Sequence, residues 1–357
     1  MPCRPTAIQI QLLRRMIDLE SRCESYEVTS GQPRKMPMRV NGSVQREDAL
    51  LQQAILQTLV YADLFDYPLT PNEVVRYFGV SAEPATILDQ LDQSVASGLL
   101  VRHNGYVALS GRDSLFDLRS YREQIAREMW PAARRYATWL ASLPFVRMVA
   151  VTGTLAVNNV ETRDDIDVFI VTAPDRLWLC RALVILVVRL AALAGDELCP
   201  NYFLSQRQLV FPDHNIFGAR EVVQMVPLYG RDLYWQIREL NGWVYDFLPQ
   251  AWDLPQPNYH QGPNGGTFVK PSRLSQSVKR TAEAILGGAF GTRLDQWEME
   301  RKVRKFNQIA QDRGGSVLFT ADVCKGHFDR HDKRIMHKFE AELAQYGLPD
   351  TGQTKET

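Results

Sequence analysis

Two aspartates, Asp165 and Asp167, stand two positions apart at the start of a run of apolar residues. Side chains two apart on a strand point to the same face of a sheet, so both carboxylates are expected to project together. Two carboxylates held this close repel each other, and a bound divalent cation relieves the repulsion. We predict a metal site here. Mg²⁺ (or Mn²⁺) suits it, because Mg²⁺ is commonly held by one or two carboxylates plus substrate phosphates.

A glycine turn precedes the acid pair. The strand-like run from Arg147 to Thr152 leads into Gly153 and Thr154. Glycine lets the backbone come near a phosphate, and the hydroxyl and amide of Thr154 can donate hydrogen bonds to it. Arg163 is a further candidate for contacting a triphosphate, the alternative being a solvated loop arginine. The turn therefore predicts a phosphate-binding element beside the metal site.

The elements around these residues carry a resemblance to a known family. The apolar run from Ile166 to Thr172 is typical of a strand buried on both faces. The segments Thr152-Gly153-Thr154 and Asp165 to Ile170 resemble the DNA polymerase beta-like nucleotidyltransferase superfamily, whose signature is a Gly-Ser or Gly-Thr turn after a strand, followed by Asp-x-Asp opening the next strand. The resemblance covers roughly residues 145 to 205. It implies an α/β (α+β) nucleotidyltransferase fold with a mixed sheet.

The resemblance also implies an activity. In that superfamily the two aspartates hold metal ions that align the α-phosphate of a nucleoside triphosphate (NTP) for attack by a hydroxyl group. We therefore expect an enzyme that transfers a nucleoside monophosphate to an acceptor, which the sequence leaves unidentified: a small molecule, a protein or a nucleic acid. The alternatives are a winged-helix nucleic-acid-binding regulator and a catalytically silent nucleotide-sensing module.

One position departs from the family pattern. The superfamily often has a third carboxylate on a later strand, and in the candidate strand from Cys199 to Leu204 the polar residue is Asn201. Asn201 is thus the third candidate metal ligand. Either Asp196 or Glu197 supplies the missing charge, or the site is altered in its chemistry or inactive.

Five regions are predicted along the chain. They are a flexible leader (1–45), a winged-helix-like domain (46–112), a helical connector (113–143), the nucleotidyltransferase domain (144–254) and a helical C-terminal region (255–357). In the connector, Pro131 predicts two helical pieces, because it would kink a continuous helix or serve as the first position of a new one. The stretch from Leu177 to Ala194 predicts a helix buried in the core.

The winged-helix-like domain is predicted from three helices and a hairpin. Thr70, Pro71 and Glu73 form a capping box with proline at the first helical position, and Asn104-Gly105 is a strong hairpin signal. The third helix, from Glu83, starts with an acidic stretch that has no Arg or Lys to offer to phosphates. Nucleic acid is therefore a possible partner that is not favoured, and a packing or dimerisation module is preferred.

Composition restricts the remaining classes. The chain has 357 residues with 41 basic and 41 acidic side chains, so no whole-molecule field attracts nucleic acid or anionic lipid. Five scattered cysteines without a Cys-x-x-Cys pair argue against a disulfide framework and a thiolate zinc site. We expect a cytoplasmic protein without a membrane partner. Near the end, His327 and His331 are interpreted as surface histidines rather than zinc ligands, and Lys325 reaches phosphate only if its segment folds back over the cleft.

Overall fold

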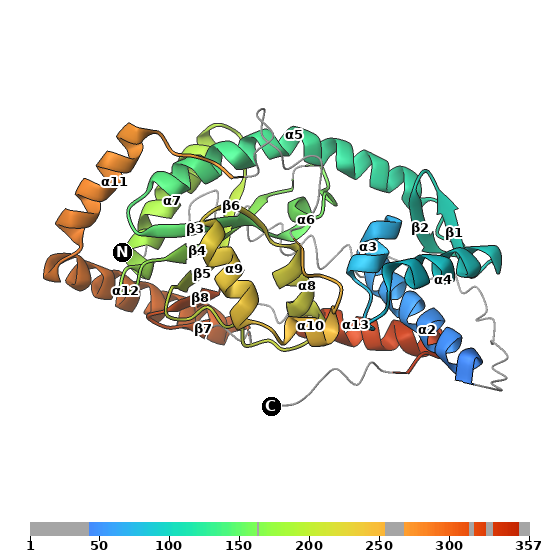
Figure 1. Ribbon diagram of the computed structural model, residues 1–357. Helices are drawn as coiled ribbons and strands as arrows, with labels where there is room; N and C mark the ends of the chain where they lie inside the picture. The colour runs from blue at the N-terminus through green and yellow to red at the C-terminus, as the bar shows by residue number, and fades with distance from the viewer. Residues whose placement is uncertain (1–42, 163, 254–267, 314–317, 326–330, 350–357) are drawn as a thin grey trace. The chain divides into compact units, whose positions relative to one another are not determined.

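The structure is a computed structural model, which describes residues 43–162, 164–253, 268–313, 318–325 and 331–349. The leader expected over 1–45 lies outside the described residues up to position 42. The first described region contains helices and a two-stranded antiparallel ribbon, in the order that the sequence predicts (Figure 1). These elements are α2 (Ser43–Asp63), α3 (Pro71–Arg76), α4 (Pro84–Ala96), β1 (Leu100–His103) and β2 (Tyr106–Leu109).

Local sequence signals explain where these elements begin and turn. The Thr70 hydroxyl accepts a hydrogen bond from the Glu73 amide, and the Glu73 carboxylate accepts one from the Thr70 amide, so the predicted capping box is confirmed. Asn104 and Gly105, between β1 and β2, both have positive φ, at 50° and 84°. A two-residue hairpin turn requires such angles at both positions, which explains the choice of Asn-Gly.

Helix α5 (Leu115–Ser142) is continuous through Pro131, so the prediction of two helical pieces was wrong. A proline inside a helix costs about 3 kcal/mol through its missing N–H and its clash with the preceding turn. Three large side chains near the proline, those of Trp130, Tyr136 and Leu140, are buried. Each such burial contributes about 1.5–3 kcal/mol of stability, so the free energy gained by packing exceeds the cost of the proline.

A mixed six-stranded sheet forms the centre of the α/β region. Its strands lie in the spatial order β6 (Val226–Tyr229), β3 (Val146–Val151), β4 (Ile166–Thr172), β5 (Leu198–Ser205), β8 (Val323–Lys325) and β7 (Leu318–Phe319). Strands β4 and β5 are parallel, and all other neighbours are antiparallel. The helix α7 (Leu177–Leu193) makes the crossover between β4 and β5. The expected α/β class with a mixed sheet is confirmed.

The two faces of the sheet carry different helices. Val168 and Ile170 of β4 belong to the core formed with α5 and α7, whereas Phe169 and Val171 belong to the core formed with α8 (Ile216–Gln224) and α9 (Arg231–Leu240). Asp167 is two residues before Phe169 and therefore points to the α8 side.

Helix α7 is present as predicted, but it is not wholly buried. Trp178 and Val184 are buried, whereas Leu186, Leu190 and Leu193 are exposed along one face. Among the helices in the described part of the chain, none combines the length and apolar character needed to cross a bilayer.

The remaining helices lie along the chain after β3. They are α6 (Gly153–Ala156), α10 (Val244–Phe247), α11 (Arg273–Leu286), α12 (Ala289–Arg313) and α13 (His331–Gln345). Helices α11 and α12 lie within the C-terminal region that the sequence predicts to be helical. His327 lies outside the described residues, so the structure gives no geometry for the pairing with His331.

Candidate metal centre

Three side chains from β4 and β5 converge on one point. A carboxylate oxygen of Asp165, one of Asp167 and the sulfur of Cys199 all lie within 4.8 Å of one another, and all three residues are half-buried. Asp165 immediately precedes β4 and Asp167 is its second residue. Cys199 is the Cα partner of Asp167 on the parallel strand β5. The expected convergence of the two aspartates is present, and Cys199 joins them.

The turn after β3 lies directly against Asp167. The backbone N–H of Thr152 donates to the Asp167 carbonyl at 3.1 Å. Gly153 has φ of 64°, and a Cβ at this position would lie 2.2 Å from Oδ2 of Asp167. A larger residue would therefore have to displace the carboxylate as well as strain the backbone. This close approach explains why glycine stands here.

The hydroxyl of Thr154 already has an acceptor. Oγ1 of Thr154 donates to Oδ2 of Asp164 at 3.0 Å, and the backbone N–H of Glu161 donates to the same oxygen at 3.0 Å. Asp164 thus ties the loop before β4 to the turn after β3. The predicted phosphate contact of Thr154 would replace or share this bond. Arg163 lies outside the described residues.

Asn201 stands beside the acids, but it uses its amide nitrogen there. Its Nδ2 donates to Oδ1 of Asp167 at 2.9 Å. The residue lies where the β4–β5 pairing shifts register between Val168 and Phe169, a bulge that turns its side chain toward Asp167. In this arrangement Asn201 orients a carboxylate, and the sulfur of Cys199 is the third potential ligand atom.

Burial has the largest effect on the pKa values of the cluster, and neighbouring like charges add to it. Burial raises the pKa of Asp167 well above its usual range, and the charges of Asp165, Glu221 and Asp164 raise it further. Burial, followed by the charge of Asp164, also raises the pKa of Asp165. Burial likewise raises the pKa of Cys199, and both aspartates add to that effect. A divalent cation would favour the ionised form of the groups that bind it and displace their protons.

Sequence analysis missed both Cys199 and Glu221. The register of two parallel strands would have revealed Cys199, since it pairs with Asp167. Glu221 lies on α8, near enough to raise the pKa of Asp167, and no spacing in the sequence connects the two residues. Burial also raises the pKa of Glu221, against an opposing effect of Lys325.

The two acids proposed as substitutes for a third carboxylate have different positions. Oδ2 of Asp196 accepts hydrogen bonds from Arg135 at 2.8 Å and from the Tyr136 hydroxyl at 2.5 Å. The Asp196 carboxylate is therefore bound to two side chains of α5. Glu197 is near enough to Asp165 for its charge to raise the pKa of that carboxyl. Of the two, Glu197 is the one that contributes charge to the centre.

The segment carrying Lys325 does fold back onto the sheet. Strand β8 pairs with β5, with Lys325 opposite Tyr202. Nζ of Lys325 lies 2.5 Å from Oδ2 of Asp213 and 5.8 Å from the ring centre of Tyr202. Lys325 therefore lies on the strand next to β5, and its charge acts on Glu221.

The chain matches no protein-family model, no curated protein and no solved structure. The case for a function therefore depends on the geometry of the site and on the residues that support it.

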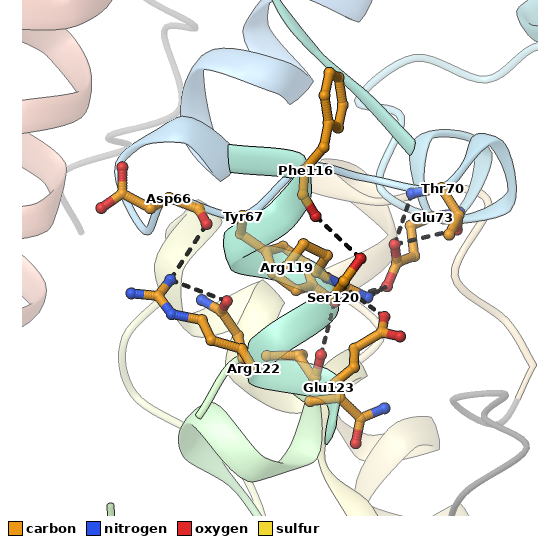
Figure 2. A network of polar contacts seen from close by, with 12 residues as sticks. Asp66, Tyr67, Thr70, Glu73, Phe116, Arg119, Ser120, Arg122 and Glu123 are labelled. Atoms are coloured by element: carbon orange, nitrogen blue, oxygen red, sulfur yellow. Dashed lines mark hydrogen bonds and ion pairs between the residues drawn. The ribbon is translucent and has the colours of Figure 1, made fainter. Parts of the chain in front are cut away.

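A polar network joins α5 to the loop between α6 and β4 (Figure 2). Arg122 donates to Oδ1 of Asn159 at 3.1 Å and to Oε1 of Glu161 at 2.9 Å, as well as to the Phe65 and Asp66 carbonyls. Asn159 donates in turn to the Phe65 carbonyl. The loop that carries Asp164 is therefore held by the helical region as well as by the sheet.

Proposed function

We propose that the chain is a metal-dependent nucleotidyltransferase, with the fold of the DNA polymerase beta-like superfamily, that transfers a nucleoside monophosphate from an NTP to an acceptor. The observation that carries the proposal is the contact between the Gly153 turn and the Asp167 carboxylate, beside Asp165. This contact puts a backbone bend that can approach a phosphate next to two metal-binding acids.

The donor set fits Mg²⁺ or Mn²⁺. Two carboxylates project from one face of the sheet at β4, and their raised pKa values reflect burial and the charges of neighbouring acids. A bound metal ion supplies charge neutralisation at the attacking and leaving oxygens during phosphoryl transfer. Asp165 and Asp167 would hold it, and the hydrogen bond from Asn201 fixes the orientation of Asp167.

The protein's own groups position the nucleotide in this proposal. Gly153 leaves room for the triphosphate close to the backbone, and Thr154, which is exposed, offers its hydroxyl. That hydroxyl donates to Asp164 in the structure, so it would have to leave or share this bond to donate to a phosphate. Catalysis of this type relies mainly on positioning and charge neutralisation, which is what a rigid turn beside fixed carboxylates provides.

One experiment tests the proposal directly. The purified protein is incubated with each NTP, labelled at the α-phosphate, with Mg²⁺ or Mn²⁺ and with acceptors from a lysate. Pyrophosphate release and covalent labelling are expected with the native chain. Both are expected to be lost in Asp167→Ala and kept in Asp89→Ala, a change at an exposed aspartate on α4. Labelling that survives Asp167→Ala contradicts the site assignment.

A catalytically silent nucleotide-sensing module is the second candidate function. The amide of Asn201, at the strand position where the superfamily often has a third carboxylate, favours it. Nucleotide binding measured by calorimetry, without pyrophosphate release in any metal, would support this alternative. Duplex DNA binding with a steep salt slope would instead support a winged-helix regulator.

A further inference from the structure

The third donor of the centre is a sulfur atom, which changes the class of ion that the site accepts. We propose that Asp165, Asp167 and Cys199 form a three-ligand site for a thiophilic divalent ion, Zn²⁺ in the cell, that competes with Mg²⁺ for the same two carboxylates. The proposal rests on the proposed function only in placing a metal at these aspartates.

Strand geometry brings the three donors together. Asp167 and Cys199 are Cα partners in a parallel pair, so their side chains leave the sheet on the same face. Asp165 precedes Asp167 by two positions and shares that face. The ligand atoms, all within 4.8 Å of one another, are close enough for one ion to contact each of them after small side-chain rotations.

Ligand chemistry separates the two ions. Mg²⁺ takes oxygen ligands and keeps several waters, so it would use the carboxylates and leave the thiol protonated. Zn²⁺ binds carboxylate oxygen at about 2.0–2.2 Å and thiolate sulfur at about 2.3 Å, in a tetrahedral arrangement. When Zn²⁺ binds, the Cys199 thiol gives its proton to solvent and the sulfur forms the metal bond.

The occupied site would have three protein ligands and one open position. In the general order of metal affinities, Zn²⁺ also binds a given protein site more tightly than Mn²⁺ does. It holds both carboxylates in one coordination sphere, so Mg²⁺ has no carboxylate left to use. Zinc is therefore expected to inhibit any Mg²⁺-dependent activity of the centre.

The other described cysteines provide the contrast. Cys180 and Cys324 are buried, and neither belongs to a group of potential metal ligands among the described residues. Cys324 lies on β8 and pairs with Phe203 rather than with an acid. Cys324→Ser is therefore the matched control for Cys199→Ser.

The test uses the full chain and Cd²⁺ alone, without nucleotide. Cd²⁺ bound to thiolate gives an ultraviolet charge-transfer band. The native chain is expected to develop this band with one ion per chain, Cys324→Ser to keep it, and Cys199→Ser to lose it. Zn²⁺ should displace the bound Cd²⁺, whereas millimolar Mg²⁺ should leave the band in place. Circular dichroism and thermal melting establish that each variant is folded.

The outcomes separate this proposal from the transferase proposal. Absence of the band in the native chain, or an equal band in folded Cys199→Ser, overturns the three-ligand site whatever the activity. A Cys199-dependent band supports the site even if no NTP is turned over. Where activity is found, the half-inhibitory Zn²⁺ concentration should rise at least about tenfold in Cys199→Ser, and an unchanged value contradicts the proposal.

Discussion

Two clusters of buried charge in this protein are built in opposite ways. At α5, Arg119 lies between two acids: its Nε is 2.8 Å from Oε1 of Glu123 and its Nη2 is 3.1 Å from Oε1 of Glu73, with the Tyr67 ring beneath the guanidinium (Figure 2). At β4, Asp165 and Asp167 lie beside a thiol and an amide, and no Lys or Arg of the described residues forms an ion pair with them.

The pKa shifts show the difference. Burial acts to raise the pKa of Glu73, but Arg119 and the hydrogen bonds from Tyr67 and Thr70 more than reverse it, so the pKa of Glu73 is lowered overall. Burial raises the pKa of Asp167, and the neighbouring acids raise it further. In the first cluster the two acids have an internal counter-ion, Arg119. The second has no such counter-ion among the described residues, and we propose that it binds an external cation.

The largest expected effect is on activity. Asp167→Asn keeps the shape of the side chain but removes the charge that holds the metal. The transfer rate should fall by about 10³-fold or more, as for other charged groups that contact transferring phosphates. Steady-state rates of Asp167→Asn and Asp89→Asn at equal protein concentration check this. A loss of less than tenfold would place the metal elsewhere.

The next effect is on stability and concerns the α5 cluster. Arg119→Met removes the guanidinium that both Glu73 and Glu123 contact in a buried position. Removing one partner of a buried ion pair costs about 3–5 kcal/mol, so urea unfolding should show a loss of that order. The surface pair Arg102–Asp92 is the control, because Arg102→Met should cost less than about 1 kcal/mol. Equal losses in the two variants would show that Arg119 is not the stabilising centre.

A glycine substitution tests the contact between the turn and the acid. Gly153→Ala adds a Cβ 2.2 Å from Oδ2 of Asp167 at a residue with φ of 64°. The carboxylate must move, and metal affinity should fall by about 10–100-fold, the range for disturbed support of a ligand. Gly195→Ala shares a positive φ of 86° but meets nothing within 4 Å, so it reports backbone strain alone. Calorimetric titration with Mn²⁺ compares them, and equal affinities would contradict the contact.

The smallest effect is a pH-dependent change in stability. The folded pKa of Asp167 is raised above its ordinary value of 3.8, so the folded state binds more protons than the unfolded chain between those two values. Without metal, stability should therefore fall as pH rises from about 4 through the folded pKa.

In Asp167→Asn this fall should be smaller, and the melting temperature near neutral pH should exceed that of the native chain by about 2–4 °C, the change that accompanies about 1 kcal/mol. Added Mg²⁺ should remove the advantage by stabilising the native chain. Melting curves from pH 4 to pH 8, with Mg²⁺ or with a chelator, measure both effects. A native chain that gains stability with rising pH in the chelator would contradict the shift.

Much of the local structure could be predicted because short-range signals determine it. The strand from Ile166 to Thr172 has the predicted bounds, and the capping box at Thr70 and the Asn104-Gly105 turn form as expected. These features depend on residues within a few positions of one another. The convergence of Asp165 and Asp167 was predictable for the same reason, since strand geometry alone brings them together.

The remainder depends on tertiary packing. Pro131 stays inside one helix because the sheet buries the side chains around it, which local propensity does not reveal. Cys199 and Glu221 reach the acids through a strand pairing and a helix docking that no spacing encodes. Arg119 and Arg122 resemble ordinary helix-surface arginines in the sequence, and only the packed structure shows that they are buried.

The parallel pairing of β4 and β5 has a consequence for how the protein folds during its synthesis. Parallel neighbours require a long connection, and here the chain crosses over through α7 between Asp167 and Cys199. Contacts so distant along the chain form slowly, because the loop between them must close first. A nascent chain that ends before β5 has the aspartates without their sulfur neighbour. An ion retained by all three donors would then act as a cross-link that holds the crossover closed once synthesis has passed it.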